Sequence, residues 1–274
     1  MVMLNNHAVS PSTWRPAAYF GGQINRDLPL YVIAHDTAGR DADSTVNFIA
    51  NGSRKASYHV IISRDGVMTQ MVSLCRQAYH AGVSQHPTKP WLKGMNRCSI
   101  GVAFDNPGEL SRTTDGTYRA WFGSTWSASE VERGHRKGRD TWHRPYTPQQ
   151  LRTFEKLVLA LDAEYGLDGV LSHHDIAPDR KVDTSPTLDP LLRALTQQVE
   201  DKAEDMPIGD RAIVATIGGL NLRRGPSINA EVIETMPWNT GLTVEPPIQS
   251  TGYVFVSTDE GQSGWAHSHY LQGI

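Results

Sequence analysis

Cysteine is scarce in this chain, since Cys75 and Cys98 are the only two among 274 residues. Two thiols form neither a disulfide framework nor a thiolate metal cluster. Their positions leave a bridge between them open, but we expect two buried free thiols. Histidine, by contrast, occurs 11 times. A metal site in this protein would therefore have to use histidine and carboxylate ligands.

Three further features are missing. The 26 Lys and Arg residues do not exceed the 29 Asp and Glu residues, so the basic excess of nucleic-acid-binding proteins is absent. No apolar run approaches the roughly 20 residues that cross a bilayer. Residues 1–7 have neither the basic start nor the apolar centre of a secretory signal. We therefore expect a protein made and folded in the cytoplasm, with no nucleic-acid partner and no membrane insertion.

Strand and helix patterns alternate through the first 205 residues. The apolar run at residues 30–35 is typical of a buried strand, and residues 43–50 are predicted to form a helix capped by Asp43. The strongest helix signal begins at Pro148 and ends at Gly166. Further strands are predicted at 58–63, 67–72, 99–105 and 170–171, and a last helix from about 190. This alternation predicts an α/β domain.

A long polar stretch interrupts this pattern at about residues 107–146. It is glycine-rich and irregular, and it carries Trp121, Trp126 and Trp142. A connection of this length inside a compact domain is often functional. Two interpretations stay open, an insertion folded onto the surface and a loop that contacts substrate.

The pattern of the sequence changes after residue 208. Short β-like runs alternate with Gly and Pro turns, at 212–217, 231–236, 242–245, 253–257 and 264–267. About 65 residues of this kind predict a small β-barrel. Met206 and Pro207 would form a linker to it.

Two histidines follow predicted strands. His35 ends one apolar run, and His173 follows another, with Lys181 and Asp183 in the next loop. A catalytic zinc needs three ligands of this kind and one open position for water. A histidine at a strand end is more often structural than a ligand, and spacing alone does not separate His173 from His174.

Five blocks of the sequence, in order, resemble the type 2 N-acetylmuramoyl-L-alanine amidases. This family includes phage lysozyme-amidases, cell-wall recycling amidases and peptidoglycan recognition proteins. Together the blocks cover roughly residues 28–195. They are YVIAHDTAG at 31–39, SYHVIISRDG at 57–66, AYHAG at 78–82, SIGV at 99–102 and HHDIAPDRKVD at 173–183.

The resemblance implies a fold, a metal and a reaction. The fold is a mixed central sheet flanked by helices. One zinc ion per chain would be held by His35, His173 and Asp183, with His174 outside the ligand set. Lys181 would supply positive charge to the oxyanion formed during hydrolysis of the bond between N-acetylmuramic acid and L-alanine. Family members that only bind peptidoglycan lack the third ligand, so Asp183 favours an enzyme over a non-catalytic binding protein.

The general base is less clear. Many family members carry a glutamate where this chain has Ala103. Phage amidases pair a tyrosine with the lysine, and Tyr58 matches that tyrosine. Asp105 lies two residues beyond Ala103 and shares its strand face, so it is a second candidate. We prefer Tyr58.

Two further histidines fall within the blocks. His80 matches a family residue that lines the peptide groove, so we expect a substrate contact there, with a histidine satisfied in the core as the alternative. We expect His59 to pack or hydrogen-bond within the sheet.

The C-terminal segment resembles a bacterial SH3-like domain. The residues that carry this resemblance are LNLRRGPS at 220–227 and GWAHSHYL at 264–271. Such modules are attached to wall hydrolases and bind peptidoglycan peptides, and a second contact raises the effective substrate concentration. A stabilising segment without a ligand is the alternative.

These observations together predict a two-domain peptidoglycan amidase. Residues 1–205 would form the zinc catalytic domain, and residues 206–274 a linker and an SH3-like barrel. The substrate would be peptidoglycan or muropeptides, as for a phage or prophage endolysin that reaches the cell wall or periplasm after release. The alternatives are a cytoplasmic amidase that recycles anhydro-muropeptides and a peptidoglycan-binding protein without turnover.

Overall fold

A computed structural model describes residues 2–204, 211–214, 219–227, 230–245 and 252–273. The chain forms two compact units. The first comprises Met1–Asn25, Tyr31–Ala160 and Gly169–Thr196, and the second Arg26–Leu30, Leu161–Asp168 and Gln197–Ile274. The predicted linker at 206–207 lies outside the described residues, so the boundary at residue 205 stays a prediction.

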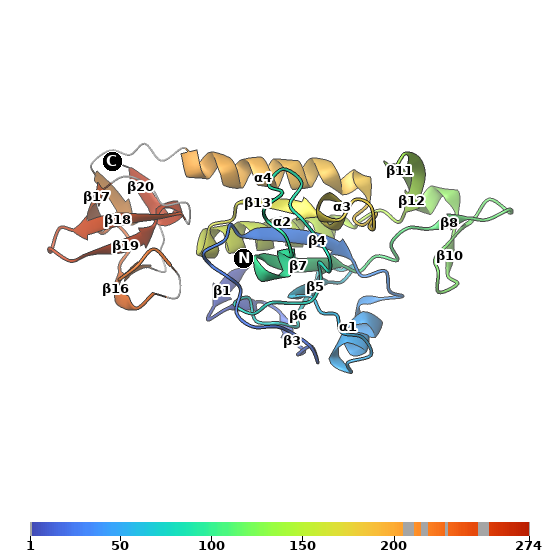
Figure 1. Cartoon of the computed structure of the whole chain (residues 1–274), viewed down its shortest axis with the longest axis horizontal. Helices are drawn as coiled ribbons and strands as arrows, with labels where there is room; N and C mark the ends of the chain where they lie inside the picture. The colour runs from blue at the N-terminus through green and yellow to red at the C-terminus, as the bar shows by residue number, and fades with distance from the viewer. Residues whose placement is uncertain (1, 205–210, 215–218, 228–229, 246–251, 274) are drawn as a thin grey trace. The chain divides into compact units, whose positions relative to one another are not determined.

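A six-stranded mixed sheet forms the centre of the first unit (Figure 1). The strand order is β13-β4-β7-β5-β6-β3, and all neighbouring pairs are parallel except β5 and β6. The predicted α/β class with a mixed sheet is therefore confirmed. The strands are β3 Thr13–Trp14, β4 Tyr31–Asp36, β5 Val60–Ile62, β6 Met68–Gln70, β7 Ser99–Phe104 and β13 Gly169–Ser172.

Helices cover both faces of this sheet. Phe104 of β7 packs against Phe154 of α2 (Pro148–Tyr165), with 5.0 Å between ring centroids. The next residue back along β7, Ala103, joins an apolar cluster with residues of α1 (Ala42–Ala50). Because side chains alternate along a strand, α1 and α2 lie on opposite faces. Asp43 is not the cap of α1, because it lies inside the first turn of the helix. Asp41, two residues earlier, caps the helix by accepting a hydrogen bond from the Ser44 N–H at 2.7 Å.

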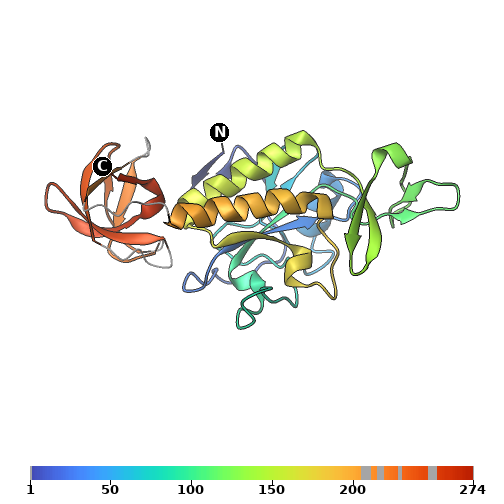
Figure 2. The ribbon, with the colours of Figure 1, turned by 90° about the horizontal axis from the view of Figure 1, so that it is seen from above.

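Edge strand β13 is held by α4 (Asp189–Glu204), whose Thr196 hydroxyl donates to the Val170 carbonyl at 2.9 Å. Figure 2 shows α2 and α4 from above. The remaining short elements are β1 Met3–Asn5, β2 Ala8–Ser10, α3 His173–Ile176 and the 3-10 helices η1 Met95–Arg97 and η3 Pro186–Leu188.

The stretch at about 107–146 is more ordered than predicted. Leu110, Tyr118 and Ala120 form a small buried core against which Trp126 and Trp142 pack. Aromatic packing therefore gives this segment structure that its polar composition does not indicate. It contains a three-stranded sheet (β8 Ser111–Arg112, β9 Tyr118–Arg119, β10 Thr125–Trp126), the 3-10 helix η2 Ala128–Glu130 and the hairpin β11 Glu132–Arg136 with β12 Arg139–His143.

The second unit contains an antiparallel seven-stranded sheet of order β16-β15-β19-β18-β17-β14-β20. Its apolar side chains form one core that includes Leu222, Val244 and Val254. The predicted strands are present where the structure describes them. β15 and β20 are additional. The bounds are β14 Arg211–Val214, β15 Leu220–Arg223, β16 Val232–Met236, β17 Gly241–Glu245, β18 Tyr253–Thr258, β19 Ser263–His267, η4 Ser268–Tyr270 and β20 Leu271–Gly273.

The two cysteines are free thiols, as expected. Cys98 is buried, whereas Cys75 is only half-buried and lies 3.3 Å from the Ser73 hydroxyl.

Candidate metal centre

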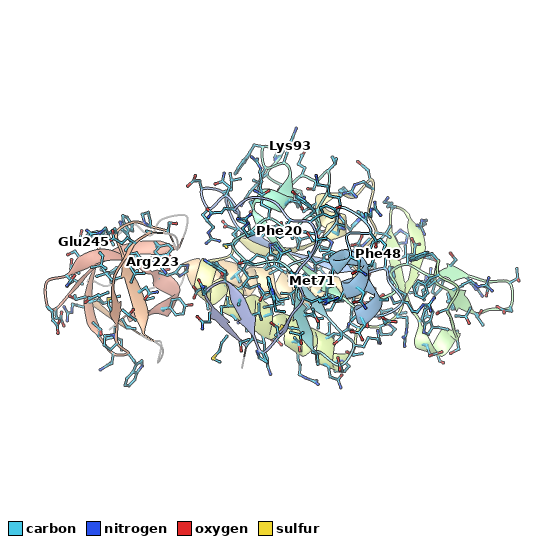
Figure 3. The ribbon with its side chains drawn as sticks, turned by 90° about the horizontal axis from the view of Figure 1, so that it is seen from below. Phe20, Phe48, Met71, Lys93, Arg223 and Glu245 are labelled. Atoms are coloured by element: carbon cyan, nitrogen blue, oxygen red, sulfur yellow. The ribbon has the colours of Figure 1, made fainter. Side chains whose placement is uncertain are left out.

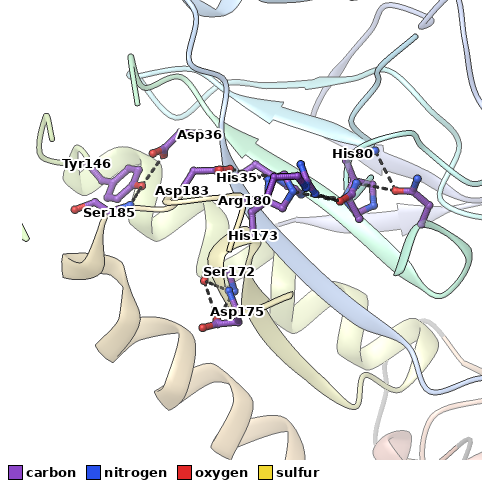
Figure 4. A network of polar contacts seen from close by, with 12 residues as sticks. His35, Asp36, His80, Tyr146, Ser172, His173, Asp175, Arg180, Asp183 and Ser185 are labelled. Atoms are coloured by element: carbon purple, nitrogen blue, oxygen red, sulfur yellow. Dashed lines mark hydrogen bonds and ion pairs between the residues drawn. The ribbon is translucent and has the colours of Figure 1, made fainter. Parts of the chain in front are cut away.

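The parallel pairing of β4 and β13 brings two predicted ligands together. Ala34 pairs with Ser172, so His35 and His173 follow at the same edge of the sheet. Ser172 caps α3, which fixes the backbone at His173. Asp183 reaches the same point from the loop between α3 and η3. Three residues that are far apart in sequence therefore meet at one site (Figure 4).

The ligand atoms of this cluster converge closely. The Nδ1 atoms of His35 and His173 are 3.0 Å apart, and Asp183 Oδ2 lies 3.0 Å from His173 Nδ1 and 3.6 Å from His35 Nδ1. His35 is fully buried. Two imidazoles and a carboxylate converge here, and a cation between them could accept one lone pair from each. The cluster can therefore hold a metal ion.

The far nitrogen of His35 is hydrogen-bonded. Its Nε2 lies 2.9 Å from His80 Nδ1, and His80 Nε2 lies 3.3 Å from the Ser99 hydroxyl, which donates to the Met95 carbonyl at 2.6 Å. If His35 Nε2 donates, His80 Nε2 donates in turn to Ser99. This direction leaves His35 Nδ1 free as a ligand, which is the usual arrangement around metal-binding histidines.

The far nitrogen of His173 is held in the same way. Its Nε2 lies 3.3 Å from the Ala81 carbonyl, so Nδ1 faces the cluster. The neighbouring His174 instead places Nδ1 2.8 Å from the Lys181 carbonyl, and its backbone N–H donates to the Asp183 carbonyl at 2.6 Å. His173 therefore joins the cluster, whereas His174 supports the loop that carries Lys181 and Asp183.

Gly101 makes room for His80. A Cβ atom at Gly101 would lie 2.4 Å from the His80 ring. The backbone N–H groups of His80 and Ala81 both donate to Asn96 Oδ1, at 3.1 and 2.7 Å. The position of the His80 ring is thus set by a missing side chain on β7 and by an asparagine. His80 also lines the pocket beside the cluster, so the predicted substrate contact stays a prediction.

The cluster has a clear protonation pattern. Burial and the charge of His173 lower the pKa of His35 to about 3, so His35 is neutral near pH 7. Burial opposes ionisation of Asp183, but the two histidines beside it, His173 and His35, outweigh burial and lower the pKa of this carboxyl. Neutral imidazole and ionised carboxylate are the forms that bind metal.

A pocket of about 270 Å³ opens beside the cluster. Tyr58 and Lys181, the predicted catalytic pair, both line it. The Tyr58 ring lies 5.2 Å from the His35 ring, centroid to centroid. Burial, together with the charges of Asp183 and Asp36, raises the pKa of Tyr58, which keeps its hydroxyl protonated. The hydroxyl can therefore donate a hydrogen bond at neutral pH.

Asp105 lies in different surroundings. Its carboxyl accepts a hydrogen bond from the Ala42 N–H, and the nearby charged groups are Arg64, Asp41 and Arg144. Burial raises its pKa to about 6. Its carboxyl is thus hydrogen-bonded to the backbone at the start of α1. Ala103, two residues earlier, pairs with His35 and contributes to the apolar cluster against which Tyr58 packs.

A buried hydrogen-bonded contact beside the cluster was not predicted from the sequence. The Tyr146 hydroxyl donates to Asp36 Oδ1 at 2.6 Å and accepts from the Ser185 N–H at 3.1 Å. Burial, with the charge of Asp183, raises the pKa of Asp36. This contact ties the residue after His35 to the loop of Asp183 (Figure 4). Only Asp36 could have been noticed in the sequence, since it directly follows the ligand His35. Tyr146 lies at the end of the long insertion, where no motif marks it.

Arg180 is a second residue that sequence reasoning missed. Its Nη2 donates to the carbonyls of Ala81 and Val83, at 2.8 and 3.0 Å. Arg180 therefore fixes the loop whose Ala81 carbonyl accepts a hydrogen bond from His173, and it lines the same pocket.

A buried cluster of two histidines and one carboxylate at the edge of an α/β sheet defines a candidate mononuclear metal site beside a pocket. The family model of N-acetylmuramoyl-L-alanine amidase matches residues 25–186, and this chain belongs to that family of enzymes. A model of the bacterial SH3 domain matches residues 218–272.

Curated relatives carry a related name. The 1,6-anhydro-N-acetylmuramyl-L-alanine amidase AmpD of Salmonella typhimurium is 27% identical over 186 residues, which is 66% of this chain and 74% of that protein. The amidase of the same name from Enterobacter cloacae is 29% identical over 182 residues, 64% of this chain and 71% of that protein.

A solved structure is similar as well. It is the N-acetylmuramyl-L-alanine amidase AmiD from E. coli in complex with the substrate anhydro-N-acetylmuramic acid-L-Ala-D-gamma-Glu-L-Lys. That chain is 21% identical with a TM-score of 0.46, and the match covers 74% of this chain and 72% of that one. Within the part of this chain that the structure describes, no helix has the length and hydrophobicity to span a membrane.

Proposed function

We propose that this protein is a zinc-dependent peptidoglycan amidase that cuts the bond between N-acetylmuramic acid and L-alanine. The observation that carries the proposal is the convergence of His35 Nδ1, His173 Nδ1 and Asp183 Oδ2 beside a pocket, in a chain of the amidase family. Two histidines and a carboxylate form a common ligand set for catalytic zinc. Bound there, zinc would supply a water with a pKa of about 7 and a Lewis acid for the scissile carbonyl.

Lys181 and Tyr58 would complete the catalytic groups. Lys181 lines the pocket beside the cluster, and after burial and His173 its charge is a further cause that lowers the pKa of His35. There it would stabilise the negative oxygen that forms when the amide is attacked. The sequence favours Tyr58 as the general base, but burial and the charges of Asp183 and Asp36 raise its pKa and keep its hydroxyl protonated. From the wall of the same pocket, this hydroxyl would instead donate a second hydrogen bond to that oxygen or pass a proton to the leaving amine.

Tyr58 is preferred to Asp105 as the residue that takes part in proton transfer. Tyr58 packs over the His35 ring and lines the pocket, whereas the charged neighbours of Asp105 are Arg64, Asp41 and Arg144. Ala103 stands where many family members carry a glutamate, so this chain has no carboxylate at that position. We propose that His80 acts chiefly through its contact with His35, in addition to lining the pocket.

Two substrates are compatible with this site. We propose polymeric wall as the main one, as for an endolysin acting at the cell wall or periplasm, because the chain carries a bacterial SH3 domain that would bind the wall. The family match ends at residue 186 and the SH3 match begins at 218, which supports a domain boundary near 205. Anhydro-muropeptides are the second candidate, since the curated relatives are named as amidases of that substrate.

Metal content tests the ligand assignment. We expect the purified protein to bind about one zinc ion per chain, and His173→Ala and Asp183→Ala to lose it. His174→Gln is the matched control, because His174 is adjacent but supports the loop rather than the cluster. Loss of zinc in His174→Gln with retention in His173→Ala would overturn the ligand set.

A further inference from the structure

A second, larger pocket lies between α1 and the long insertion. Its volume is about 720 Å³, and its walls are mainly apolar. Phe48 of α1 and Trp121 and Phe122 of the insertion line it. Figure 3 shows Phe48 on α1. Phe48 is 48% exposed and Trp121 is 79% exposed, so two large aromatic side chains face solvent at one place. Exposed apolar surface of this kind marks binding sites.

Trp121 is held in position by its polar atom. The indole Nε1–H donates to the Ala38 carbonyl at 2.7 Å. Ala38 belongs to the loop after β4, and the next residue, Gly39, packs so tightly on Thr45 that a Cβ there would lie 2.2 Å from Thr45 Oγ1. The indole therefore rests on a loop that is itself fixed against α1. A preorganised aromatic face loses little entropy when it binds.

This aromatic pocket continues the pocket at the metal cluster. Thr37, Thr45, Phe48 and Arg54 line both of them. The two pockets differ in chemistry. The pocket at the cluster contains four cationic side chains, which suit the carboxylates of a stem peptide, whereas the second has aromatic walls and Arg40, Asp41 and Arg54. Aromatic faces suit the C–H faces of pyranose rings, with polar groups at the rim for hydroxyl and acetamido groups.

We propose that the pocket of Phe48, Trp121 and Phe122 binds the glycan strand next to the muramic acid whose amide is cut. This proposal rests on the amidase function proposed above, because it assigns the sugar side of the substrate to a wall that the insertion supplies. The insertion would then distinguish saccharide chains from single-sugar fragments, and Trp121 would be its main specificity residue.

The test compares substrates of different glycan length. Rates would be measured for a muramyl peptide with one sugar and for a tetrasaccharide of alternating N-acetylglucosamine and N-acetylmuramic acid that carries the same peptide. For Trp121→Ala we expect kcat/KM to fall about tenfold on the tetrasaccharide, the factor that corresponds to ~1.4 kcal/mol, and to stay within about twofold on the single-sugar substrate. Trp91→Ala, which removes another exposed tryptophan (61%) that lines neither pocket, should change neither rate.

Three additional arms separate the outcomes. Phe122→Ala, at a residue that lines the aromatic pocket but not the pocket at the cluster, should repeat the loss on the tetrasaccharide, which keeps the test valid if Trp121→Ala misfolds. Binding of the peptide-free tetrasaccharide to the full chain should weaken in Trp121→Ala, and this readout does not need catalysis. Lengthening the peptide on the single-sugar substrate should leave the ratio of variant to wild-type rates unchanged.

Each contrary result has a distinct meaning. Equal losses on both substrates, no loss on either, or a loss that follows peptide length would overturn the glycan assignment. Failure of the wild-type chain to cleave either substrate would instead contradict the proposed amidase function, while the binding arm would still test the aromatic pocket.

Discussion

His35 connects the candidate metal centre to the interior of the sheet. One ring nitrogen faces His173 and Asp183, and the other faces His80, which continues to Ser99. Such partners fix the tautomer and orientation of a metal-binding histidine. The geometry of the ligand cluster therefore depends on residues outside the ligand set.

Gly101→Ala tests this dependence. The added methyl would lie 2.4 Å from the His80 ring, so the ring must move and His35 Nε2 must lose its partner. We expect zinc affinity to fall about 10- to 100-fold, measured by competition with a chelator. Gly22→Ala is the control, because a Cβ at Gly22 meets no atom within 4 Å. Unchanged affinity in Gly101→Ala would contradict the role given to His80.

Tyr58→Phe separates the two candidates for proton transfer. It keeps the ring over His35 and removes only the hydroxyl. We expect kcat to fall about 100-fold, in the range of a general acid–base group, with zinc content unchanged. Asp105→Asn should retain most of the activity, because its carboxyl accepts a hydrogen bond from the Ala42 N–H and it does not line the pocket at the cluster. Full activity in Tyr58→Phe would refute the assignment.

The buried His59 should make the folded state less stable in acid. Its Nδ1 accepts from the Gly101 N–H at 2.9 Å, and burial lowers its pKa from 6.5 to about 4. The unfolded chain binds this proton first as the pH falls, so the contribution is complete above pH 6.5 and is lost between about pH 6.5 and 4. We expect the difference in unfolding free energy between wild type and His59→Asn to shrink by ~2 kcal/mol from pH 7 to pH 5.

Chemical denaturation at both pH values measures this difference. The asparagine oxygen can still accept from Gly101 but does not titrate. An equal difference at both pH values would show that His59 is not kept neutral by the fold.

At the scale of elements, α2 is held on the sheet by its buried stripe. Phe154 is fully buried and contacts Phe104. Phe154→Ala should lower the free energy of unfolding by about 3–5 kcal/mol, followed by helical circular dichroism in denaturant. Arg152→Ala, at an exposed position of the same helix, should change it by less than about 0.5 kcal/mol. Equal effects would contradict the assigned packing face.

The elements differ in how well the sequence predicts them. Strands β4 and β7 and helix α2 follow from apolar runs and caps, because these signals are local. The ordered structure of the insertion does not follow from local signals. Tyr118 and Trp142 are 24 positions apart, and only tertiary packing brings their rings together. The same limit applies to the site. The ligands lie in family blocks, but the bond between Tyr146 and Asp36 spans 110 positions and has no motif.

At the scale of the whole molecule, the two matched domains predict separable activities. Removing residues 206–274 should reduce association with purified sacculi while leaving hydrolysis of small muropeptides within about twofold. A sedimentation assay with sacculi and a parallel rate measurement would check this. Undiminished association would mean that the SH3 domain does not bind the wall.

The central claim is that a zinc ion at His35, His173 and Asp183 drives cleavage between muramic acid and L-alanine. Mass analysis of the products tests it most directly, with purified muropeptides digested by the protein as isolated, after chelation and after zinc is restored. We expect free stem peptides that begin with L-alanine, loss of these products on chelation and their return with zinc. Cleavage at a sugar linkage, or activity that chelation leaves unchanged, would contradict the account.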